Sequence, residues 1–145
     1  MRVMAIDYGD ARTGVAVSDD SATLAGEAWV IHSRNENETA QFLTDEVKKR
    51  DVSCIVVGYP KNMNGTIGPR AEKSEHFAEL LRSFLNQGGD SSEVVLWDER
   101  MTTISAHRVL SDAGKHGKKR KKAIDAVAAS LILESYLAYL KTKSN

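Results

Sequence analysis

Three acidic residues, far apart in the chain, each stand next to an element that is expected to be buried. Asp7 ends the first apolar run, Glu99 follows the apolar run 94–97, and Asp125 lies in the first turn of the last predicted helix. An ionised carboxylate at the end of a buried strand is costly unless it is paired, hydrogen-bonded or bound to a metal. Each acid also has an ordinary explanation: a turn, an exposed ion pair with the following arginine, and a favourable charge near a helix N-terminus, respectively.

Taken together, the three acids predict a metal site for phosphodiester chemistry. Ligands of open α/β sheets gather outside the carboxyl ends of the strands, where Asp7 and Glu99 are expected. The small residues around Asp125, in the stretch AIDAVAA, would let its helix approach the sheet closely. Mg²⁺ prefers oxygen ligands and keeps positions open for water and phosphate oxygens. The residue types and their placement therefore favour Asp7, Glu99 and Asp125 as metal ligands.

A run of basic residues precedes the third acid. Residues 115–122 read KHGKKRKK, while the rest of the chain holds 14 basic and 20 acidic residues, although the net charge of the whole chain is zero. Such asymmetry indicates a polyanionic partner, and the alternative is a solvated loop that lysines keep soluble. We expect nucleic acid as the partner, because contacts of this kind position a phosphate backbone without reading its sequence. The candidate phosphate contacts are Arg12, Lys118, Lys119, Arg120, Lys121 and Lys122.

Hydrophobic periodicity predicts elements in the order β-β-β-α-β-α-β-α-α. The strands are expected over 2–8, 14–18, 24–32, 52–57 and 94–97, and the helices over 35–50, 71–86, from 102 or 103 to 110, and over 123–140. The first three strands are spaced so closely that only an antiparallel meander can connect them. On the helix 35–50, Phe42, Leu43 and Val47 are expected on one side. The order predicts an α/β fold, in which a mixed sheet carries helices on its faces, with residues 1–145 forming a single domain.

The composition is that of an ordinary globular protein. Apolar residues make up 41% and charged residues 28% of the chain. The single cysteine, Cys54, lies in an apolar run and is expected to behave as a small buried hydrophobe. Because there is no signal peptide and no apolar stretch of about 20 residues, we expect a cytoplasmic, soluble protein without a membrane partner.

Four motifs, in order along nearly the whole chain, carry a resemblance to a known family. The stretches IDYGDARTGVAVSD, VVGYPKNMNGTIGPRAEKSEHFAELL, LWDERMTTISAHRVL and KKRKKAIDAVAASLILESYL resemble the YqgF/RuvX family of Holliday junction resolvase-like nucleases. The resemblance implies a five-stranded RNase H-like mixed sheet with helices on both faces. It also implies a nuclease site for two divalent ions, Mg²⁺ or Mn²⁺, whose catalytic and metal-binding residues are Asp7, Glu99 and Asp125. The associated role is processing of the 5′ end of pre-16S rRNA in ribosome biogenesis.

Two other functions are compatible with the same fold. The family is also described as resolving four-way DNA junctions, and a non-catalytic nucleic-acid-binding factor would keep the fold without metal. Cutting a junction symmetrically requires two active sites, so a homodimer would favour junction DNA and a monomer would favour single-strand processing. Beside the strand 52–57, Tyr59 is a candidate to stack on a base, and the alternative is a packed or exposed tyrosine.

A kinase or ATPase is a further alternative function for this sequence. The stretch DYGDARTG also resembles the first phosphate motif of the actin, hexokinase and sugar-kinase superfamily. Those proteins hold nucleotide between two domains, and 145 residues have room for one. The sequence also lacks a Gly-x-x-x-x-Gly-Lys-Ser/Thr motif, which argues against ATP use.

Overall fold

A mixed five-stranded sheet forms the centre of the protein. The computed structural model describes residues 1–98 and 117–144, with the side chains of 117–125 and 144 outside that description. The strands are β1 (Val3–Asp7), β2 (Arg12–Ser18), β3 (Ala25–His32), β4 (Cys54–Tyr59) and β5 (Glu93–Asp98), in the spatial order β3-β2-β1-β4-β5. Strands β1, β2 and β3 pair antiparallel, as predicted, whereas β4 and β5 extend the sheet parallel to β1.

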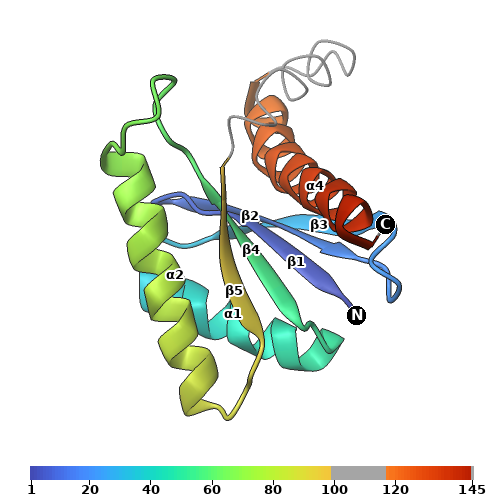
Figure 1. Ribbon diagram of the computed structural model, residues 1–145. Coiled ribbons are helices and arrows are strands. Elements are labelled where there is room, and N and C mark those ends of the chain that lie inside the picture. The colour runs from blue at the N-terminus through green and yellow to red at the C-terminus, as the bar shows by residue number, and fades with distance from the viewer. Residues whose placement is uncertain (99–116, 145) are drawn as a thin grey trace.

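Helices cover both faces of this sheet (Figure 1). The helices are α1 (Glu36–Arg50), α2 (Pro69–Gln87) and α4 (Gly117–Ser144). Of these helices, α1 and α2 lie on one face and α4 lies on the other. Side chains alternate along β1 accordingly, so that Met4 and Ile6 pack in the cluster with α1 and α2, and Val3 and Ala5 pack with α4. This arrangement confirms the predicted mixed sheet with helices on both faces.

The two helices of the first face begin differently, α1 with a side-chain cap and α2 with a proline in its first turn. The Asn35 side chain accepts a hydrogen bond from the Glu38 N–H at 3.1 Å, which satisfies one of the free donors at the start of α1. Helix α2 begins two residues earlier than predicted, because Pro69 occupies its first turn, where a missing N–H costs nothing. The expectation that Phe42 lies on the buried side of α1 is wrong, since this side chain is 43% exposed and Leu43 and Val47 face the core.

Helix α4 packs against the other face through a continuous apolar stripe. The residues that it buries there are Ala129, Ile132, Leu133, Tyr136 and Leu137. The Trp97 indole N–H at the end of β5 donates to the Ser135 hydroxyl at 3.1 Å, and its ring packs edge-on against Tyr136 at 5.2 Å. Cys54 is buried beneath the helix, as predicted, and its thiol donates to the Tyr136 hydroxyl oxygen at 3.8 Å.

The last helix is longer than the sequence predicts. It runs from Gly117 to Ser144, so residues 118–122, which we expected in a loop, form its first turns. Lysine and arginine are good helix formers, and no Gly or Pro interrupts the chain between 118 and 144. The short helix predicted to end at 110 lies outside the described residues. Within the described part, no helix is long and apolar enough to cross a membrane.

Candidate active site

Asp7 is the one acid of the predicted set whose side chain the structure describes. It is the last residue of β1, at the carboxyl end of the strand, and it is half-buried. Because Val3 and Ala5 face α4 and side chains alternate along a strand, the Asp7 carboxylate lies on the α4 face. Apolar side chains precede it, and the hairpin to β2 begins directly after it. The structure therefore places Asp7 at the edge of the sheet where the sequence predicts a site.

Two glycines flank Asp7 on the neighbouring strands. Asp7 pairs directly with Gly14 of β2. On the other side, Ile6 pairs with Val57 of β4, so Gly58 is the next residue level with Asp7. Residues level with one another on adjacent strands point to the same face of a sheet. The carboxylate consequently stands between two positions that carry no side chain on the α4 face.

The side chains of the other two predicted acids lie outside the part of the chain that the structure describes. Glu99 follows β5 and lies outside the described residues. Asp125 lies on α4, four residues before Ala129, which α4 buries against the sheet, but its side chain is not described. Among the side chains that the structure describes, no group of three or more His, Cys, Asp and Glu could hold a metal ion. The three-acid metal set therefore stays a prediction.

The candidate phosphate contacts come from two places in the fold. Arg12 is the first residue of β2, just across the hairpin from Asp7, and pairs with His32 of β3. Residues 118–122 lie on the first turns of α4, with their side chains undescribed. In Figure 1 the first turns of α4 lie towards the edge of the sheet where β5 ends. A basic helical segment thus approaches the same edge as Asp7.

A cavity of about 360 Å³ lies on the opposite side of the hairpin, against α1 and α2. Its charged or aromatic lining residues are Tyr8, Asp10, Glu36, Glu72, Lys73 and His76. The Tyr8 ring stacks on Phe77 with 4.2 Å between centroids, and burial, followed by the charges of Glu36 and Asp10, raises its pKa. No local pattern in the sequence indicates this cavity. Tyr8 and Asp10 belong to the motif IDYGDARTGVAVSD, but only tertiary packing places them beside residues of α1 and α2.

Tyr59 is not available to stack on a base. Its side chain is only 8% exposed at the end of β4, and its hydroxyl donates to Glu75 of α2. The Lys61 ammonium lies 5.5 Å from the centre of its ring. The hydrogen bond to Glu75, helped by desolvation, raises the pKa of Tyr59 to about 12. Of the two alternatives for this residue, the packed tyrosine is correct.

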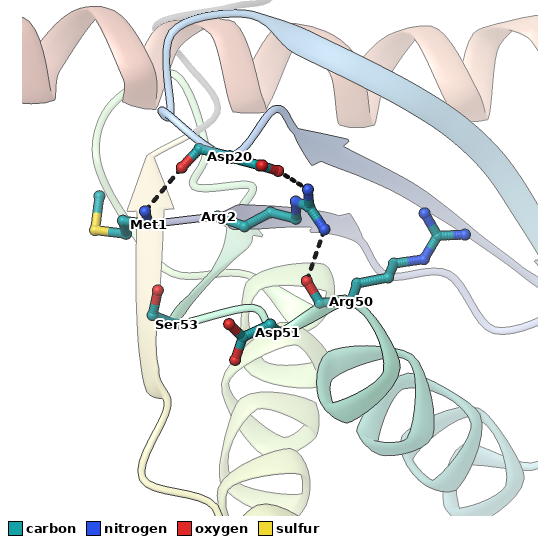
Figure 2. Close-up of a pocket in the computed structure, with 6 residues that line it drawn as sticks. All are labelled: Met1, Arg2, Asp20, Arg50, Asp51 and Ser53. Carbon is teal, nitrogen blue, oxygen red and sulfur yellow. Dashed lines mark hydrogen bonds and ion pairs between the residues drawn. The ribbon is translucent and has the colours of Figure 1, made fainter.

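A second cavity, of about 490 Å³, lies at the other end of β1 (Figure 2). Arg2 lies between an ion pair with Asp20 and the Arg50 carbonyl, to which it donates at 2.8 Å. The N-terminal ammonium donates to the Asp20 carbonyl at 2.8 Å. Arg2 lies five positions before Asp7, which corresponds to roughly 17 Å along an extended strand. These groups bind one another and join the start of β1 to the end of α1, away from the carboxyl ends of the strands.

Solved structures share the architecture. The fowlpox virus resolvase, solved with its substrate Holliday junction DNA, aligns with a TM-score of 0.63 over 97% of this chain and 99% of its own, at 10% identity. RuvC of T. thermophilus, in complex with a Holliday junction substrate, aligns with a TM-score of 0.61 over 95% and 96%, at 12% identity. At such low identity the likeness shows the fold alone, which is the RNase H-like fold expected from the sequence.

Sequence relatives are much more similar. A protein of Halothermothrix orenii, named "Putative pre-16S rRNA nuclease", is 45% identical over 139 residues, which are 96% of each chain. A protein of the same name from Caldanaerobacter subterraneus subsp. tengcongensis is 46% identical over 138 residues, covering 94% of this chain and 96% of its own. The family described as "RuvX: Holliday junction resolvase" matches residues 1–139. With the fold and the end-to-end sequence match in agreement, the chain belongs to the RuvX family.

Proposed function

We propose that this protein is a metal-dependent endonuclease that processes the 5′ end of pre-16S rRNA. The observation that carries the proposal is the match, at 45% identity over 96% of both chains, to a relative named "Putative pre-16S rRNA nuclease". The position of Asp7, at the carboxyl end of β1 and on the face that α4 covers, supports it independently.

The donor set fits a hard divalent cation. Asp7, Glu99 and Asp125 would hold one or two Mg²⁺ or Mn²⁺ ions, because carboxylate oxygens are the ligands that these ions prefer. Gly14 and Gly58 support the fit, since a Cβ at either position would project onto the face that the Asp7 carboxylate uses. When bound, such ions supply charge stabilisation at a phosphate and an activated water.

The chain's own residues would position the substrate. Asp125 lies four residues before Ala129, and positions four apart share a helix face, so packing of α4 on the sheet would bring this acid towards Asp7. Arg12 and the segment 118–122 would contact phosphates on either side of the acids. These contacts hold a strand in place without selecting its sequence and make affinity fall with salt.

The test is cleavage of labelled pre-16S rRNA and of a four-way DNA junction, each with Mg²⁺ or Mn²⁺. Wild type, Asp7→Asn and the matched control Asp45→Asn are compared, since Asp45 is an exposed aspartate on α1. We expect RNA cleavage by wild type and the control, and none by Asp7→Asn. Equal cleavage by Asp7→Asn would contradict the assignment of the site.

Junction resolution is the second candidate, favoured by the description of the family that matches residues 1–139. It requires two sites in one assembly, so a homodimer that cuts the DNA junction and leaves the RNA intact would establish it in place of RNA processing. Salt-sensitive binding of RNA without cleavage by wild type would instead indicate a non-catalytic binding factor.

A further inference from the structure

The cavity between the β1–β2 hairpin and helices α1 and α2 has no part in the proposed chemistry. Its volume of about 360 Å³ lies within the range of roughly 300 to 1,000 Å³ typical of small-molecule sites. Tyr8, which lines it, directly follows Asp7 along the chain, so the two Cα atoms are about 3.8 Å apart. Their side chains point to opposite faces of the sheet, because they are consecutive residues at the end of a strand. Both residues lie at the end of β1, so a nucleic acid strand that crosses this end of the sheet would reach Asp7 on one face and the cavity on the other.

Tyr8 offers a fixed aromatic surface. Phe77 is fully buried in α2 and stacks on one face of the Tyr8 ring, with an angle of 13° between the two planes. The cavity can meet only the other face or the edge of this ring. Aromatic side chains that are held in place stack on nucleobases of any sequence, since every base has a π-face.

The charged groups of the cavity are paired, with one exception. The Lys73 ammonium lies 2.8 Å from the Asp10 carboxylate, and the His76 ring lies 3.3 Å from Glu36. Glu72 lines the same cavity and is exposed, and its carboxylate has no ion-pair or hydrogen-bond partner in the part of the chain that the structure describes. A carboxylate of this kind accepts hydrogen bonds from an exocyclic amino group of a base.

An adjoining cavity of about 130 Å³ adds positive charge. Arg70 lines it together with Tyr8, Gly9 and the ion pair of Lys73 with Asp10. Arg70 is exposed and has no carboxylate partner within the described ranges. A phosphate beside a base bound at Tyr8 would find the Arg70 guanidinium within this space.

We propose that these two cavities bind the nucleotide next to the scissile phosphate, with its base unpaired and carrying an exocyclic amino group. Tyr8 stacks on the base, Glu72 accepts a hydrogen bond from the amino group, and Arg70 contacts the phosphate. The choice of a nucleotide as the ligand rests on the proposed nuclease function and deepens it. A site of this kind prefers a single strand, or a strand with a flipped base, and favours cytosine over uracil in the cavity at Tyr8.

The test measures binding of short labelled oligo(C) and oligo(U) RNA in EDTA, where cleavage is absent. Cytosine and uracil are nearly identical in shape, so their affinity ratio isolates the amino group. Wild type should prefer oligo(C) about tenfold, the effect of one hydrogen bond to a charged group. Glu72→Gln should bring the ratio close to one, because an amide can pair with either base. The matched control Glu79→Gln, exposed on the same helix, should keep the wild-type ratio.

Tyr8 is tested by a pair of variants. Tyr8→Leu removes the ring and should weaken binding of both oligonucleotides about five- to hundredfold, whereas Tyr8→Phe keeps the ring and should bind as wild type does. Because Tyr8→Leu also loses its stacking on Phe77, its thermal unfolding is measured alongside, and Glu72→Gln serves as the variant that leaves the core untouched. Equal affinities of folded Tyr8→Leu and wild type, or an unchanged ratio in Glu72→Gln, would overturn the proposal.

The same samples separate this inference from the proposed function. A base preference in EDTA that depends on Tyr8 and Glu72, in a protein that cuts no RNA with Mg²⁺ or Mn²⁺, would support the nucleotide site and contradict the nuclease. Cleavage of pre-16S rRNA without any base preference in binding would support the nuclease and contradict the nucleotide site.

Discussion

Replacing Leu133 by alanine tests the packing of α4 on the sheet, on which the candidate site depends. Leu133 is fully buried and contributes to the cluster formed with Val3, Ala5 and Val56 of the central strands. The substitution removes three carbon groups, worth about 0.8 kcal/mol each in transfer free energy, and leaves a cavity. We expect the free energy of unfolding to fall by about 3–4 kcal/mol. At about 2–4 °C per kcal/mol for a domain of this size, Tm should fall by roughly 10 °C.

Urea and thermal unfolding followed by circular dichroism measure both quantities. The control is Glu134→Ala, which changes the next residue of the same helix, on its exposed side, and should change the stability by less than about 0.5 kcal/mol. A fall of less than about 1 kcal/mol in Leu133→Ala would refute the packing of α4 at this position. The proposal that α4 brings Asp125 towards Asp7 would then lose its basis.

Three further predictions concern the site and its supporting elements. Glu75 raises the pKa of Tyr59 to about 12, above its unfolded value near 10, so the stability from this bond is complete below pH 10 and is lost as the pH rises to 12. Over this pH interval, the free energy of unfolding should fall less in Tyr59→Phe than in wild type. Equal falls in the two proteins would contradict the role of this hydrogen bond. Asn35→Ala should cost about 1 kcal/mol in urea unfolding through loss of the α1 cap, whereas Asn35→Gly should cost only a few tenths. Gly58→Val should abolish RNA cleavage while the protein remains folded, because the valine side chain would lie beside Asp7 on the same face of the sheet. Full activity of this variant would show that the substrate does not use this position.

Most elements could be predicted because their signals are local. Strands and helices leave apolar residues at periods of 2 and 3.6, and turn residues mark their ends, so the element order follows from neighbouring positions alone. Phe42 shows the limit of this reasoning. Its spacing fits the buried side of α1 as well as that of Leu43, and only the position of the helix on the sheet decides which of the two faces the core.

The basic segment shows a different limit. The sequence predicts the last helix only from 123 onwards, after the run of like charges at 118–122. Charge and backbone conformation are separate properties, however, and lysine-rich segments readily form helices when nothing interrupts them. The helix begins at Gly117 and places these residues on the same element as Asp125.

The sequence by itself determined the family, the order of the elements and the candidate acids, because motifs and periodicity are carried by residues close together in the chain. Only the tertiary structure decided what surrounds Asp7. The register of β1 with its two neighbours brings Gly14 and Gly58 beside the carboxylate, and packing of α2 against the hairpin forms the cavity at Tyr8. Strand register and helix docking depend on contacts between residues distant in sequence, which no local pattern records.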